Sequence, residues 1–207
     1  MKLSKKFLRK SMIQKTTAML LTAGIMTITA CSREDGGSSV SISNDGKVNS
    51  RIVENFDKSY YDQEELKQKI LREADEYNLT AGEGAVSVEK VDVDEDVVKV
   101  EMTYATAADY AAFNDADFFV GSAAEAQDAG YNLNRVLISA NNSLETIGMS
   151  DILGMTDAKI LITDAKDPVV LNGKAEYTSN NVTMDEKLKT ASFDEESKEL
   201  AYIIFTN

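Results

Sequence analysis

The sequence predicts an α+β fold, with an N-terminal helix and further short helices packed on antiparallel sheet and hairpins. Three observations favour this fold class: a strong helical period over residues 62–78, a change to a period of two after residue 85, and a strand-rich segment from residue 159 onward. Helices followed by antiparallel strands, with only short βαβ units between them, are typical of α+β domains.

The clearest helix is expected over residues 62–78. Asp62 is followed three residues later by Glu65, which resembles a capping box at a helix start. Apolar residues then recur at helical spacing along one face, whereas Lys, Glu and Gln occupy the other. The apolar residues are Leu66, Ile70, Leu71, Ala74 and Tyr77. We therefore expect a surface helix packed on another element.

Residues 86–104 predict a β-hairpin with one solvated face. Apolar and polar residues alternate on both sides of a short acidic break at Asp94, Glu95 and Asp96. Alternation with a period of two is typical of a strand that is buried on one face only.

The next segment is expected to hold a helix and a strand. Residues 106–114 are rich in alanine and begin with Thr106 and Asp109 in capping positions, which predicts a helix. Residues 118–121 are apolar and too few for a helix, so they predict a short buried strand.

A second short helix is expected after this strand. Ser122 and Glu125 have the spacing of a capping box, and Gly130 can end the helix. Residues 136–138 are apolar and expected to be buried, and the stretch that follows, up to Gly154, shows no clear period.

The C-terminal segment reads as strands, beginning with the apolar run at residues 159–163. Residues 168–171 and 174–178 are separated by Asn172 and Gly173. Asn-Gly is the strongest two-residue hairpin signal, because both residues accept positive φ. We therefore expect a hairpin here, and a final hairpin formed by residues 191–193 and 200–205.

The first thirty residues have the composition of an export signal. Six basic residues precede an uncharged segment at residues 16–30, and no acidic residue occurs before Glu34. This arrangement is typical of a secretory signal peptide. The uncharged segment is shorter than the roughly twenty apolar residues that span a bilayer.

Ile28, Thr29, Ala30 and Cys31 resemble the lipobox of bacterial lipoproteins, in which an aliphatic residue and two small residues precede a cysteine. Ile28 and Thr29 depart from the commonest residues of that motif. The resemblance implies diacylglycerol transfer to the Cys31 sulfur, cleavage between Ala30 and Cys31, and an anchor on the outer face of the cell membrane, or on the outer membrane of a cell with two membranes. The alternative is an ordinary secretory signal.

Three segments follow from this interpretation: a signal peptide at residues 1–30, a lipidated cysteine and flexible tether at 31–50, and one globular domain at 51–207. Residues 32–50 are rich in Ser, Gly, Asn and Asp, which is typical of a flexible linker. The domain can alternatively be divided into two small halves, at about 51–140 and 141–207.

Composition limits the partners. The chain has 22 Lys and Arg against 35 Asp and Glu, and the predicted mature chain loses six of the basic residues, so its formal charge falls from −13 to −19. Such a surface repels nucleic acids. We expect attachment to the membrane through covalent lipid on Cys31, and either an envelope protein or a neutral or cationic small ligand as partner. Cys31 is the only cysteine, so no internal disulfide is expected.

The absence of histidine from the sequence excludes Ser-His-Asp and Cys-His catalysis and His-ligated metal sites. Because lipid occupies the thiol of Cys31 in this interpretation, thiol catalysis is excluded as well. The sequence predicts no catalytic residue and no cofactor.

Asp92, Asp94 and Asp96 resemble the start of a calcium-binding loop and are weak candidates for metal ligands. Such a loop needs Gly where Val97 stands and Glu where Thr103 stands. A solvated hairpin tip is the simpler interpretation.

Two further motifs match by spacing alone. Ser87 and Lys90 fit S-x-x-K, but positions three apart on a strand point to opposite faces. Gly82, Glu83 and Gly84 follow a helix and lack the third glycine of a dinucleotide loop.

Exposed aromatic side chains would indicate a sugar-binding groove, and the chain has no tryptophan to form one. Tyr60, Tyr61 and Tyr131 are the candidates, although packing at a helix entry and in a loop is the favoured interpretation of all three. Carboxylate pairs for glycoside hydrolysis are expected by chance in so acidic a chain.

These observations favour a non-enzymatic binding or interaction module displayed on the membrane. A carboxylate-dependent hydrolase acting on cell-wall or extracellular polymers is one alternative. A structural subunit of an envelope complex is another.

Overall fold

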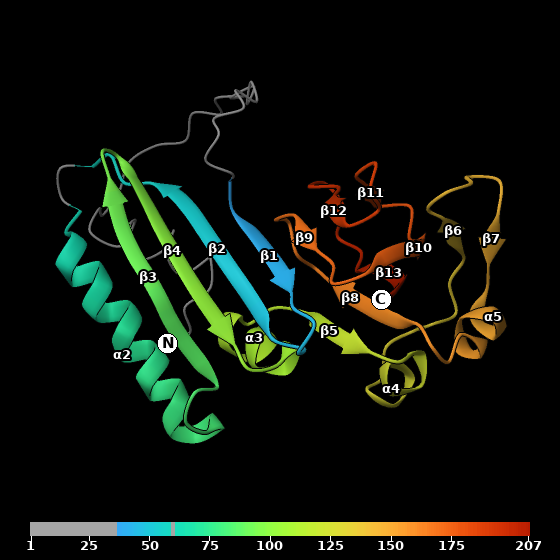
Figure 1. Cartoon of the computed structure of the whole chain (residues 1–207), viewed down its shortest axis with the longest axis horizontal. Coiled ribbons are helices and arrows are strands. Elements are labelled where there is room, and N and C mark those ends of the chain that lie inside the picture. The colour runs from blue at the N-terminus through green and yellow to red at the C-terminus, as the bar shows by residue number, and fades with distance from the viewer. Residues whose placement is uncertain (1–36, 59–60) are drawn as a thin grey trace.

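The computed structural model describes residues 37–58 and 61–207. Ala30, Cys31 and the rest of the predicted leader lie outside this range, as does Tyr60. The described residues form thirteen strands in two sheets and four helices. Figure 1 shows β3, β4, β2 and β1 on one side of the molecule, with α2 beside β3, and the second sheet on the other side with α4 and α5.

The larger sheet, sheet A, has seven strands in the order β11-β12-β9-β1-β2-β4-β3. All neighbours are antiparallel except β1 and β9, which are parallel and pair Val40 with Val169. The strands are β1 (Ser39–Ile42), β2 (Val48–Asn55), β3 (Val86–Asp94), β4 (Val97–Tyr104), β9 (Val169–Val170), β11 (Val182–Met184) and β12 (Thr190–Phe193).

The smaller sheet, sheet B, has six antiparallel strands in the order β5-β8-β13-β10-β6-β7. They are β5 (Phe118–Gly121), β6 (Leu137–Ser139), β7 (Thr146–Ile147), β8 (Lys159–Thr163), β10 (Lys174–Thr178) and β13 (Ala201–Thr206). The helices are α2 (Gln63–Ala81), α3 (Ala107–Asn114), α4 (Ala123–Asp128) and α5 (Met149–Gly154).

The predicted α+β fold with an N-terminal helix is therefore wrong. The structure is mostly β, with 37% strand and 23% helix. Strands β1 and β2 precede the first described helix, α2, and strands from both ends of the chain share sheet A. The apolar residues of α2 repeat at helical spacing over a long segment, which is a strong local signal. Strands of two to four residues, such as β9, β11 and β1, are too short to show a repeating pattern.

Burial explains the two kinds of strand. In β4 alternate residues are buried, so sheet A has one apolar and one polar face. In β8 and β13 nearly every residue is buried, because sheet B is covered on both faces. Leu161 and Ile203 belong to a core shared with sheet A and α2. Ile162 and Ile204 belong to a second core with residues of α4 and α5.

Several local predictions are confirmed. Helix α2 begins after Asp62, whose carboxylate accepts a hydrogen bond from Glu65 N at 2.8 Å. β3 and β4 form the expected hairpin, and α3, β5 and α4 occur where they were expected. Ser122 and Glu125 form a complete capping box at the start of α4.

Both predicted C-terminal hairpins are wrong. Asn172 and Gly173 connect β9 in sheet A to β10 in sheet B, so they link two sheets rather than two paired strands. The backbone of Gly173 is instead so close to that of Thr206 that a Cβ would collide with the Thr206 carbonyl group. Likewise β12 pairs with β11 and β9, whereas β13 lies in sheet B.

The folded domain includes residues that precede its predicted start at residue 51. Residues 39–42 and 48–50, which were assigned to a flexible linker, lie in β1 and β2 of sheet A. Val40, Ile42 and Val48 are buried in the shared core. Sheet A therefore includes residues about a dozen positions before residue 51. Each sheet also contains strands from both sides of residue 140, so the chain does not divide into two halves there.

Candidate functional site

A groove with a cavity volume of about 720 Å³ lies where α3, β5 and the segment after α4 meet. Volumes of about 300–1,000 Å³ are typical of ligand sites. Figure 1 shows β5 between α3 and α4 at the lower side of the molecule. The residues that line the groove are Thr106, Ala107, Ala108, Ala111, Ala112, Asp115, Ala116, Asp117, Phe118, Phe119, Val120, Ala129, Tyr131 and Asp164.

One wall is the alanine face of α3. The helix begins after Thr106, whose hydroxyl accepts a hydrogen bond from Asp109 N at 3.0 Å. Its large side chains pack inward: Phe113 is buried, and the ring of Tyr110 lies 4.6 Å from that of Phe118. The alanines are left to face the groove, and their small side chains keep it open.

The opposite wall is aromatic. The rings of Phe119 and Tyr131 lie 5.3 Å apart and tilted. A Cβ on Gly121 would lie 2.7 Å from Cζ of Phe119, so the glycine makes room for this ring. Aromatic faces attract cations, and the wall therefore suits an apolar group or a positive charge.

Three carboxylates gather at one end of the groove. Asp115 ends α3 in the left-handed conformation, Asp117 precedes β5, and Asp164 follows β8. Two hydrogen bonds join Asp117 and Asp164: Asp164 N donates to Asp117 O, and Asp117 N donates to the Asp164 carboxylate, both at 3.1 Å. No Lys or Arg is among the described residues that line the groove.

A smaller cavity of about 170 Å³ adjoins this acidic end and shares Asp115, Ala116 and Asp164 with the groove. Its lining includes Arg51 and Lys166. Arg51 and Lys166 line this smaller cavity but not the groove, whose own lining carries acidic side chains alone among its charged groups.

The carboxylates influence two tyrosines. Burial raises the pKa of the Tyr131 phenol above its ordinary value, and the negative charges of Asp117 and Asp164 raise it further. Burial, with smaller contributions from Tyr104, Asp167 and Asp164, raises the pKa of Tyr110. Both phenols are therefore neutral at physiological pH, and that of Tyr131 can donate a hydrogen bond into the groove.

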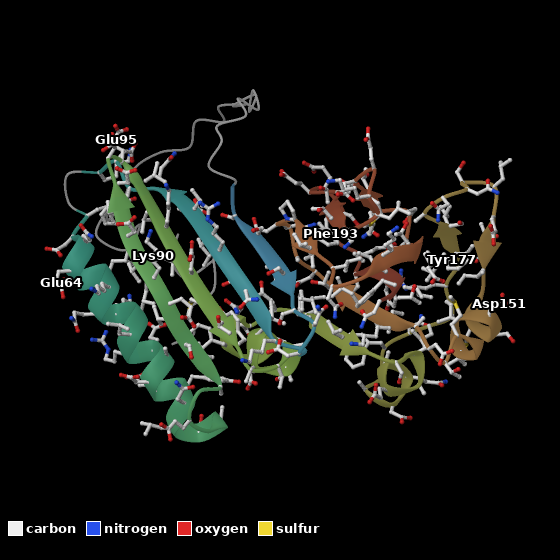
Figure 2. All side chains as sticks on the ribbon, in the orientation of Figure 1. Glu64, Lys90, Glu95, Asp151, Tyr177 and Phe193 are labelled. Atoms are coloured by element: carbon white, nitrogen blue, oxygen red, sulfur yellow. The ribbon has the colours of Figure 1, made fainter. Side chains whose placement is uncertain are left out.

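The structure does not place Asp92, Asp94 and Asp96 together as ligands of a metal ion. Asp92 is paired with Lys90 across 3.2 Å, and Glu95 lies at the tip of the hairpin (Figure 2) with a positive φ of 52°. Over residues 37–58 and 61–207, no three His, Cys, Asp or Glu residues are placed to hold a metal ion.

Ser87 and Lys90 lie on one face of β3, contrary to the expectation from a regular strand. A β-bulge between Val88 and Lys90 shifts the register, so that Ser87 pairs with Thr103 and Lys90 with Glu101. The Lys90 ammonium is nevertheless held by Asp92 rather than by Ser87.

The remaining motif residues have structural roles. Gly82 and Gly84 adopt positive φ in the turn after α2. The ring of Tyr61 packs 4.9 Å from that of Phe56 at the entry to α2. Among the helices of the described segments, none is long and apolar enough to cross a bilayer.

Of the groove residues, the sequence pointed only to Tyr131. Asp117 and Asp164 are 47 positions apart and meet because β5 pairs with β8. The available signals were the four alanines of α3 and an aspartate at the end of each strand. Neither signal indicates a binding site until the pairing of β5 with β8 is known.

Comparison with known proteins finds no matching family model, no matching curated protein and no matching solved structure.

Proposed function

We propose that this protein is a non-enzymatic binding module, held on the outer face of a membrane by lipid on Cys31, which binds a cationic ligand in the groove between α3 and Tyr131. The observation that carries the proposal is the lining of this groove. It combines an aromatic wall, a wall of alanines and three carboxylates, with no basic side chain among its described lining residues.

Electrostatics supports a cationic ligand. The chain carries a formal charge of −13, so its long-range field attracts cations. At short range, Asp117 and Asp164 supply carboxylate oxygens, and the rings of Phe119 and Tyr131 supply faces for a cation or its apolar stem.

The early start of sheet A supports a position close to the membrane. If Cys31 carries lipid, only residues 32–38 separate it from β1. Fully extended, these residues span at most about 25 Å. The groove would then meet ligands at the membrane surface rather than deep in the surrounding space.

Binding of a polyamine to the full chain in mild detergent tests the proposal. We expect spermidine to bind by isothermal titration calorimetry, and an uncharged polyether of similar length not to bind. The double variant Asp117→Asn and Asp164→Asn keeps the shape of both side chains but removes two charges, and should weaken binding at least tenfold. Ten-fold corresponds to about 1.4 kcal/mol.

The double variant Asp75→Asn and Glu76→Gln is the matched control, because both residues are exposed carboxylates on α2 and neither lines the groove. It removes the same two negative charges from the chain and should leave the affinity unchanged. Equal loss in both variants would mean that only the overall charge attracts the cation, and would contradict a binding site in the groove. Release of products from wall polymers at a rate that depends on Asp117 or Asp164 would instead favour a hydrolase.

A further inference from the structure

Strand β5 forms an edge of sheet B, and the groove runs along this edge. Within the described part of the chain β5 pairs with β8 alone. Edge strands present a row of backbone donors and acceptors that another strand can use. Phe118, Phe119 and Val120 of β5 all line the groove.

The pairing pattern shows which backbone groups face the groove. In antiparallel strands, opposed residues alternate between hydrogen-bonded and non-hydrogen-bonded pairs. Asp164 N donates to Asp117 O, so Asp117 and Asp164 form a hydrogen-bonded pair. Phe119 and Gly121 must then bond to β8, and the N–H and C=O groups of Phe118 and Val120 point away from it.

The hydrogen bonds between β10 and β13 lead independently to the same assignment of which β5 residues bond to β8. Ser179 N donates to Tyr202 O, so Tyr202 bonds toward β10. Ala201 and Ile203 therefore bond toward β8, opposite Thr163 and Leu161. That leaves Ile160 and Ile162 for β5, opposite Gly121 and Phe119. Both arguments therefore leave the N–H and C=O groups of Phe118 and Val120 pointing away from β8, toward the groove.

We propose that the ligand is an extended polypeptide segment that pairs with β5 as an added strand and places a lysine or arginine side chain beside Asp117 and Asp164. This inference rests on the proposed function and specifies its ligand. Added strands gain affinity from backbone hydrogen bonds and specificity from side-chain pockets.

The walls of the groove fit such a strand. Phe118 and Val120 belong to the face of sheet B that packs on α3, whereas Phe119 and Tyr131 belong to the opposite face. A strand in the plane of the sheet would lie between the alanines of α3 and the side chains of Ala129 and Tyr131. β5 has four residues, so the paired length is about 13 Å.

Charge favours a basic segment over a second copy of this chain. Two copies, each with a formal charge of −13, repel each other. The end of the groove where Asp115, Asp117 and Asp164 lie would repel an acidic segment and attract a basic one.

Peptides with selectively blocked backbones test the pairing. The parent probe is a capped hexapeptide of alternating alanine and lysine, titrated calorimetrically into the full chain in mild detergent. In a strand, all alanine N–H groups point to one edge and all lysine N–H groups to the other. One isomer is N-methylated at every alanine and the other at every lysine.

We expect one isomer to bind as tightly as the parent and the other to bind at least tenfold more weakly, since only one edge of the peptide can face β5. Equal affinity of the two isomers, whether retained or lost, overturns strand addition. An analogue with glutamine in place of lysine should also bind at least tenfold more weakly.

A variant of the protein makes the complementary test. Val120→Pro removes the N–H that faces the groove and leaves the bonds to β8 in place. It should weaken binding of the alternating peptide at least tenfold and weaken spermidine binding much less, because spermidine does not pair with the backbone of β5. Met184→Pro is the matched control, because Met184 lies on β11, one of the two edge strands of sheet A. If proline at residue 120 prevents folding, the two methylated peptides decide.

The outcomes separate the two proposals. Binding of spermidine without binding of the peptide overturns strand addition but leaves the cation-binding groove. Failure of both probes overturns both. Tight peptide binding that Val120→Pro and N-methylation do not affect identifies a basic ligand held by side chains alone, and overturns strand addition.

Discussion

The ring of Phe119 lies over Gly121, so close that a Cβ at residue 121 would come within 2.7 Å of Cζ of Phe119. The nearest atom is the far end of a side chain rather than backbone. The position of the aromatic wall of the groove therefore depends on the absence of a side chain two residues away.

Gly121→Ala should push the Phe119 ring away from its contact with Tyr131. Adding a methyl group to a packed site typically costs about 1–3 kcal/mol, and the low end applies because a ring tip can move. We expect a loss of about 1 kcal/mol in urea unfolding followed by circular dichroism, together with weaker binding of spermidine. Gly154→Ala is the control, since nothing lies within 4 Å of that added Cβ. Unchanged binding in Gly121→Ala would show that the ring does not contact the ligand.

Gly173→Ala should be more damaging. Its Cβ would collide with backbone, lying 2.7 Å from the carbonyl carbon of Thr206. Because backbone in a paired strand cannot move aside, we expect a loss of about 3 kcal/mol, measured by urea unfolding. Asn172→Ala changes the other residue of the pair without this collision and should cost less. If the two variants are equally stable, the close approach of Gly173 to β13 is not what requires a glycine there.

Lys166 holds the loop between β12 and β13. Its ammonium group donates to Ser197 O at 2.6 Å and to Asp194 O at 3.1 Å. Hydrogen bonds to a charged group are worth about 1.5–3 kcal/mol when buried, and exposure of Lys166 reduces this. We expect Lys166→Met to cost about 1 kcal/mol and to speed hydrogen exchange at residues 194–198. Lys189→Met, at an exposed lysine outside this loop, should change neither.

The protein should lose stability in alkali through Tyr104. This side chain is 0% exposed, and burial raises the pKa of its phenol above the ordinary value. Above pH of about 10 the unfolded chain releases the Tyr104 proton and the folded chain keeps it, so the unfolded state gains stability. The free energy of unfolding should fall by about 1.4 kcal/mol per pH unit from this residue.

Urea unfolding between pH 8 and pH 11 measures this effect. The fall is absent below the pKa of the unfolded phenol and begins above it. Tyr104→Phe has no proton to release and should show a shallower fall over the same range. An equal slope in both proteins would assign the alkaline loss to other groups, of which Tyr110 is the first candidate because burial raises its pKa as well.

The predictable parts of the fold are those with local causes. Helix α2 is found because its cap and its apolar stripe lie within one short segment. The β3–β4 hairpin is found because long alternating strands flank an acidic turn. β5 and α4 follow the same logic, with a capping box between them.

The rest depends on contacts that the local sequence does not encode. β9 has two residues, and its partner β1 lies near the opposite end of the described chain. Asn172 and Gly173 carry the correct turn signal, but their flanking strands belong to different sheets. The groove was missed for the same reason, since Asp117 and Asp164 are neighbours only through the pairing of β5 with β8.

The parallel pairing of β1 with β9 also bears on how the protein is made. Both ribosomes and membrane channels deliver the amino end first, so Val40 emerges long before Val169. Until then one edge of β1 stays bare, and bare strand edges promote aggregation. Distant pairings also slow folding. We therefore expect a chaperone to bind the nascent chain until nearly the whole polypeptide has emerged.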